Sequence, residues 1–132
     1  MNKRWFLFLA IAVVSAGLLS IAAADTADDL FEKALEAERA GELETAVEFL
    51  TRAAELDSRN AAIYVNRGGV YAKGKQFDKA IEDFNRALNI DPDNIGATYN
   101  RGTAYFDQGD LQRALNDYDS VLRMDEGHLP AL

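Results

Sequence analysis

Cysteine is absent from this chain of 132 residues, and histidine and tryptophan each occur only once. Without cysteine, no disulfide can close the fold and no thiolate can act as a nucleophile, so stability has to come from packing alone. The single histidine, His128, lies at the very end of the sequence. No set of nucleophile, base and orienting group can therefore be assembled, and we predict no catalytic, metal or cofactor site.

Basic residues are outnumbered by acidic residues, 14 to 22, which gives a formal net charge of −8. Nucleic-acid binding needs lysine and arginine gathered on one face, so we expect no nucleic-acid partner.

Several pairs of acidic residues could suggest a metal site. The segment that starts at Asp91 begins like a calcium loop, but its twelfth residue is Gly102, where a bidentate glutamate is required. We expect turns between structural units to explain these aspartates instead. The pairs are Asp28 with Asp29, Asp91 with Asp93, Asp117 with Asp119, and Asp125 with Glu126.

The first 24 residues read as a targeting segment. Lys3 and Arg4 form a short basic start, residues 5–21 are almost entirely apolar, and Ala22 and Ala24 form an A-x-A pattern before Asp25. We expect a cleaved signal peptide over residues 1–24 and an exported protein, periplasmic or secreted if the source is bacterial. An uncleaved anchor is the alternative, because the apolar run is just long enough to cross a bilayer. It is the only route to the membrane that we expect.

The rest of the sequence repeats with a period of 34 residues. A shift by one period superimposes eight identical residues in a single frame. A period of this length is typical of stacked supersecondary units. The identical pairs are Asn66 with Asn100, Arg67 with Arg101, Gly68 with Gly102, Tyr71 with Tyr105, Ala80 with Ala114, Asp83 with Asp117, Leu88 with Leu122, and Asp91 with Asp125.

Each period predicts two antiparallel helices joined by a short turn. In the middle unit, Pro92 predicts that the second helix ends near Ile90 and that the next helix starts near Ile95. Gly41 and Gly109 occupy equivalent turns, where a left-handed residue ends the first helix. The middle unit carries Gly74 one position earlier, so we expect its turn to differ slightly.

The middle unit resembles a tetratricopeptide repeat. It carries tyrosine, arginine, glycine, tyrosine, alanine, phenylalanine, alanine and proline at the spacing of that family, in Tyr64, Arg67, Gly68, Tyr71, Ala80, Phe84, Ala87 and Pro92. The resemblance implies an all-α, right-handed α-solenoid of three antiparallel helix hairpins. We expect one domain over residues 25–132 with repeats 27–60, 61–94 and 95–128. The outer repeats depart most from the pattern, with Ser58 and Glu126 at the proline position.

The resemblance also implies that a protein or peptide partner binds in the concave groove, which is lined by the first helix of each hairpin. Asn66 and Asn100 recur at one repeat position, and two amides at that spacing can pair with an extended peptide backbone. The family's clamp for a terminal carboxylate has lysine and asparagine at two first-repeat positions, where this chain has Phe31 and Leu35. It also has a basic residue where Asn100 stands, so only Asn66 fits the clamp. The inward positions that we assign to the groove are Phe31, Leu35, Val65, Asn66, Gly69, Lys73, Tyr99, Asn100, Thr103 and Phe106, with Asp28, Glu32, Glu38, Ala72 and Asp107 beside them.

The functional prediction is therefore an exported protein-interaction module, such as an envelope scaffold or assembly factor. The alternative is a structural module that self-associates through its third repeat. After His128 only four residues follow, and the apolar face of the last helix then lacks a polar cap.

We predict that the mature protein starts at Asp25 and is found outside the cytoplasm, because the A-x-A site lies directly before it. N-terminal sequencing of envelope material checks this. Recovery of membrane-bound protein that still carries residues 1–24 would instead establish the anchor.

Overall fold

Six helices make up the part of the chain that the structure describes. This computed structural model describes residues 23–127, so the predicted signal segment falls almost entirely outside the described residues. The helices are α2 (Ala27–Arg39), α3 (Leu43–Leu56), α4 (Ala61–Lys73), α5 (Phe77–Ile90), α6 (Ile95–Asp107) and α7 (Leu111–Glu126). The boundaries predicted from Pro92 are confirmed, because α5 ends at Ile90 and α6 starts at Ile95.

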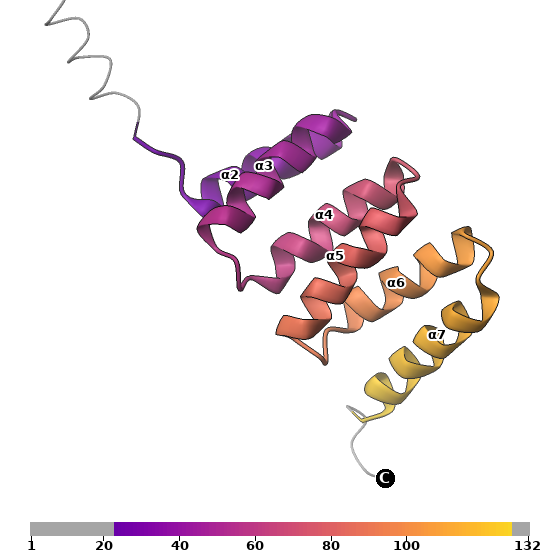
Figure 1. The fold of residues 1–132 in the computed structure, drawn as a ribbon. Coiled ribbons are helices and arrows are strands. Elements are labelled where there is room, and N and C mark those ends of the chain that lie inside the picture. Colours follow the sequence, from indigo (N-terminus) through magenta and orange to yellow (C-terminus); the bar gives the residue numbers. More distant parts are fainter. Residues whose placement is uncertain (1–22, 128–132) are drawn as a thin grey trace, which may run out of the picture.

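The helices pair into three antiparallel hairpins, α2 with α3, α4 with α5 and α6 with α7, and each hairpin packs on the next (Figure 1). The second helix of one hairpin contacts the first helix of the following one, α3 with α4 and α5 with α6. The predicted α-solenoid is confirmed. Between residues 23 and 127, none of the helices is long and apolar enough to cross a membrane.

Side chains at one repeat position start the first helix of every hairpin. The carboxamides of Asn60 and Asn94 accept hydrogen bonds from the backbone N–H groups of Ala62 and Ala97. Thr26 holds the same position in the first hairpin, where it forms a capping box with Asp29. These caps satisfy backbone N–H groups that have no partner within the helix, so each unit begins at a fixed residue.

The turns inside the three hairpins share one backbone conformation. Gly41, Lys75 and Gly109 have positive φ values of 79°, 59° and 85°. After each of them, the next backbone N–H bonds the carbonyl five residues back, at 2.9, 2.8 and 2.9 Å. The expectation that the middle turn differs is therefore wrong. The left-handed position is set by the repeat, and Lys75 adopts it although Gly74 is adjacent.

The core sits between the layers of helices, where small residues let helix axes approach each other. Ala46, Ala80 and Ala114 on the second helices are at most 2% exposed. Phe84 is fully buried, and its ring lies directly against Gly68 of α4: a Cβ built on Gly68 would lie 2.7 Å from Phe84 Cε1. The close helix crossing thus depends on the missing side chain at Gly68.

Gly68 and Gly69 are adjacent on α4 but have opposite surroundings, since a Cβ on Gly69 would meet nothing within 4 Å. We predict that Gly68→Ala destabilises the protein by about 1 to 3 kcal/mol through overpacking. Gly69→Ala should stabilise it by about 0.5 to 1 kcal/mol, because alanine loses less backbone entropy in a helix. Urea unfolding of both variants checks the pair, and shifts of the same sign would contradict this packing.

Candidate functional site

A hollow of about 420 Å³ opens between α4 and α6, and Phe84 of α5 is part of its lining. It brings together four residues that the sequence assigned to the groove: Gly69, Lys73, Asn100 and Thr103. Ala72 and Asp107 from the same prediction and Ala104 complete the lining. Gly69 leaves space in this wall because it has no side chain. The hollow therefore joins the second and third repeats on the side of their first helices.

Other predicted groove residues lie elsewhere. Phe31 and Val65 are half-buried and pack against the core that joins the first two hairpins. Leu35 is half-buried on α2. Tyr99 and Phe106 are exposed on α6, at 53% and 56%. The predicted stripe therefore divides into an inner part that supports the fold and an outer part that a partner can reach.

The two recurring asparagines differ in their bonding. Asn66 donates from Nδ2 to the carbonyl oxygen of Ala62 at 2.8 Å, one turn earlier on its own helix. The amide donor of Asn66 is therefore already used within its own helix, because the carbonyl four residues earlier lies within reach of a short polar side chain. Asn100 is half-buried in the wall of the hollow, and its side chain makes no hydrogen bond within residues 23–127. The two positions are thus not equivalent.

An aromatic edge lies beside Asn100. The rings of Tyr99 and Tyr118 are 5.6 Å apart and tilted by 48°. The Tyr118 hydroxyl lies 3.1 Å from Thr103 Oγ1, so α7 holds the outer wall of the groove in place. This edge offers flat apolar surface and hydroxyl groups to a ligand.

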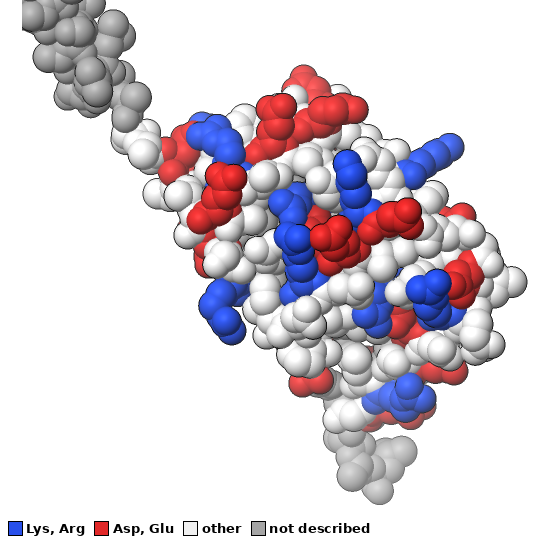
Figure 2. Space-filling model, in the orientation of Figure 1, with Lys and Arg blue, Asp and Glu red and all other residues white. Residues whose placement is uncertain are grey.

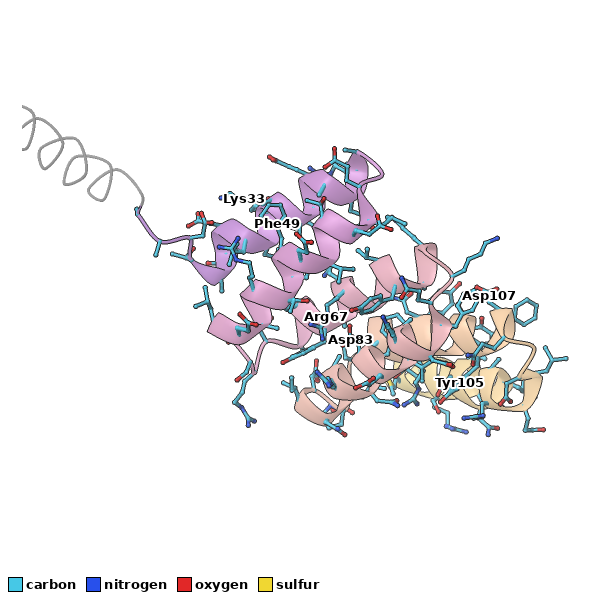
Figure 3. All side chains as sticks on the ribbon, turned by 45° about the horizontal axis from the view of Figure 1, so that its top comes forward. Lys33, Phe49, Arg67, Asp83, Tyr105 and Asp107 are labelled. Atoms are coloured by element: carbon cyan, nitrogen blue, oxygen red, sulfur yellow. The ribbon has the colours of Figure 1, made fainter. Side chains whose placement is uncertain are left out.

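The charge of the groove is weakly acidic. Lys73, the cation in the hollow, also pairs with Glu38 of the first repeat, which links α2 and α4. Asp107 lies in the same hollow and is labelled in Figure 3. On the face drawn in Figure 2, acidic and basic side chains are interspersed, and no broad basic patch forms there.

Two ion pairs, one buried and one partly buried, repeat with the period. Arg67 donates from Nε and Nη2 to both carboxylate oxygens of Asp83, each at 2.7 Å, and Figure 3 shows the two side chains facing each other. Arg101 and Asp117 form the same bidentate pair at 2.8 and 2.7 Å. The prediction that Asp117 belongs to a turn is wrong, because it is buried in the middle of α7. Of the four acidic pairs assigned to turns, only Asp91 with Asp93 lies between helices, and the others lie within α2 or α7. The identity of Asp117 with Asp83 one period earlier, 16 residues after an arginine, was the signal that could have found it.

Each arginine also reaches the preceding hairpin. Arg67 Nη1 donates to Thr51 Oγ1 at 3.2 Å, and Arg101 Nη1 donates to Asn85 Oδ1 at 2.8 Å. The hydrogen bonds to Asp83 and Asp117 raise the pKa of both guanidinium groups above the usual value, so they stay charged. The first hairpin has Lys33 and Phe49 at these positions, and Lys33 pairs with Asp25 at 2.7 Å instead.

We predict that Asp83→Ala destabilises the protein more than Asp117→Ala. The first change leaves Arg67, whose side chain is only 10% exposed, buried without its counter-charge, which costs about 3 to 5 kcal/mol. Arg101 is 24% exposed and can turn toward water, so Asp117→Ala should cost about 1.5 to 3 kcal/mol. Chemical unfolding of the two variants measures the difference, and equal losses would argue against it.

Comparisons with known proteins agree with this geometry. The family model described as "TPR repeat" matches residues 68–109, and that described as "Tetratricopeptide repeat" matches residues 97–131.

Solved structures with a similar fold include the second TPR of Spaghetti (RPAP3) bound to the HSP90 peptide SRMEEVD. It is 29% identical, with a TM-score of 0.72 over 76% of this chain and 93% of that one. The TPR domain of Arabidopsis OM64 is 28% identical, with a TM-score of 0.74 over 78% and 85%. MamA is 27% identical, with a TM-score of 0.75 over 77% of this chain and 60% of its own. With its repeated helical hairpins, their small-residue crossings and these matches, the chain is a tetratricopeptide repeat protein.

Proposed function

We propose that this protein binds an extended segment of another protein in the hollow between α4 and α6. The observation that carries the proposal is the side chain of Asn100, half-buried in the wall of the hollow with both its donor and its acceptor unused within residues 23–127. An amide in this state can pair with a peptide backbone through two hydrogen bonds. The exposed ring of Tyr99 and the Thr103 hydroxyl lie close enough to contact neighbouring side chains of the ligand.

Peptide binding by similar domains supports the general role. RPAP3 domains are bound to the HSP90 peptide SRMEEVD and to the HSP70 peptide SGPTIEEVD, both of which end in acidic residues. In this chain, Lys73 already pairs with Glu38, and Asp107 lies in the hollow. An acidic terminus would meet repulsion there, so we propose a neutral or basic segment as the ligand.

The proposed setting is outside the cytoplasm, because the sequence starts with a basic and then apolar segment that ends at an A-x-A site. There the protein would act without catalysis, as an envelope scaffold or assembly factor. If residues 1–24 are retained, the same groove would be displayed from a membrane anchor.

A structural role is a second candidate. Leu111, Leu115 and Leu122 of α7 are 62%, 55% and 61% exposed, and exposed leucines on one side of a helix favour association. In this candidate role, a second copy of the chain would cover the face. Light scattering after gel filtration, with Leu122→Glu as the control, separates a self-associating protein from a monomer.

We predict that replacing both Asn66 and Asn100 with Ala weakens partner binding at least tenfold. Each lost hydrogen bond is worth about 0.5 to 1.5 kcal/mol, and a tenfold loss corresponds to about 1.4 kcal/mol. Asn100→Ala alone should account for most of the loss, because the Asn66 donor is already bonded to Ala62. The measurement is affinity for the partner that crosslinking in the native envelope identifies.

Asn89→Ala is the matched control, since Asn89 is exposed on α5 and lies outside the hollow. It should leave affinity unchanged. Thermal unfolding should show a shift below about 0.5 kcal/mol for Asn89→Ala, as for most exposed positions. Asn66 and Asn100 are half-buried, so the double variant should lose no more than the net value of one hydrogen bond, about 0.5 to 1.5 kcal/mol. Reduced stability with unchanged affinity would show that the asparagines support the fold rather than the ligand.

A further inference from the structure

The position that accepts a hydrogen bond from the arginine of the next hairpin recurs in all three hairpins, but in the third it has no arginine partner within residues 23–127. Arg67 reaches Thr51 on α3, and Arg101 reaches Asn85 on α5, which is one period later. One more period leads to Asp119 on α7. Asp119 is exposed and takes part in no hydrogen bond or ion pair within residues 23–127. At the place where an incoming guanidinium binds in the earlier hairpins, α7 therefore presents a carboxylate.

The apolar residues around Asp119 show the same pattern. On α5, the residues Phe77, Ile81 and Leu88 are half-buried and pack against the core clusters that include α6 residues Ala97 and Ala104. Their counterparts on α7 are Leu111, Leu115 and Leu122, which are all more than half exposed. The outer face of α7 thus has the composition of a surface that another helix covers, with a carboxylate in its middle.

The helices that cover α3 and α5, which are α4 and α6, indicate which residues a helix needs in order to cover α7. At the equivalent positions, α4 has Ile63, Arg67 and Val70, and α6 has Ala97, Arg101 and Ala104. An arginine is thus preceded by an apolar residue four positions earlier and followed by one three positions later. This spacing places all three on one face of a helix.

The chain's own α2 does not fit this description. It has Asp29, Lys33 and Glu36 at the same three positions, all exposed. Stacking a second copy in the register of the repeats would bury Asp29 and Glu36 against leucines, and buried carboxylates without partners are costly. A pair of α7 helices packed face to face would bring two Asp119 carboxylates of like charge into one interface. The charges therefore favour a different molecule as the occupant.

We infer that the outer face of α7 binds an amphipathic helix of another protein, with arginine pairing to Asp119 and apolar residues four before and three after it covering the leucines. A guanidinium on a carboxylate inside an apolar contact gives both affinity and register. This site is on α7, whereas the hollow is lined by residues of α4, α5 and α6. The inference therefore does not depend on the proposed peptide-binding function.

The test uses the ¹⁵N-labelled protein and two synthetic peptides. The first has the sequence of residues 61–76, which contains α4, and the second has that of residues 27–42, which contains α2 and its three charged residues. The first peptide should shift the amide resonances of residues 111–123 and bind at least tenfold more tightly than the second. Equal binding of the two peptides, no binding of the first, or shifts on α3 or α5 instead of α7 would each overturn the inference.

A charge exchange tests the role of Asp119 directly. Asp119→Lys should weaken binding of the first peptide at least fivefold, and a peptide with glutamate in place of its arginine should bind this variant more tightly than the unmodified protein. Asp93→Lys, in the exposed turn before α6, is the matched control and should change neither affinity. If light scattering shows a dimer that Leu122→Glu dissociates, a second copy is the occupant and the inference is wrong.

Discussion

A helical hairpin can bury only one side of its two helices, so each hairpin of this protein depends on a neighbour to cover the rest. How closely the two helices of a hairpin approach is determined by the residues at the point where they cross. Gly68 lets α4 approach the ring of Phe84 so closely that no Cβ would fit, and Ala80 beside it is fully buried. The first helices α4 and α6 of successive hairpins lie next to each other, because each hairpin packs on the next. The hollow is the space that remains open between these two helices.

The buried arginines give this packing its register. Each guanidinium holds a carboxylate of its own hairpin with two hydrogen bonds and uses a third to reach the preceding hairpin. Buried ion pairs add little net stability compared with apolar residues, because desolvation offsets their attraction. A bidentate pair nevertheless has one good geometry, which an apolar contact does not. Arg67 and Arg101 are therefore best understood as the residues that fix how far each hairpin is rotated against the next.

The sequence predicts much of this architecture because the period of 34 residues couples local and global features. The boundaries at Ile90 and Ile95 follow from Pro92, and the small residues at the crossings follow from the repeat. What it did not predict depends on three-dimensional context. Lys75 takes a left-handed conformation because the repeat's hydrogen bonds fix the turn, which outweighs the local preference for the adjacent glycine. Asp117 is buried in α7 because it pairs with Arg101, and a pair of acidic residues in the sequence does not reveal that contact. Asn66 bonds the carbonyl four residues earlier on its helix, whereas Asn100, at the same repeat position, lies in the wall of the hollow, and the repeat alone does not distinguish the two.

The two ends of the solenoid are chemically different, and that difference has consequences for how it can associate. At α2, the positions that would face a preceding hairpin hold Asp29, Lys33 and Glu36, so this end is already suited to water. At α7, the corresponding surface holds exposed leucines around Asp119. A polar end and an apolar end do not complement each other in the repeat register, because the carboxylates of the first would lose their hydration against the leucines of the second. Growth by stacking identical copies is therefore opposed at α2, while α7 remains suited to a helix that carries its own arginine.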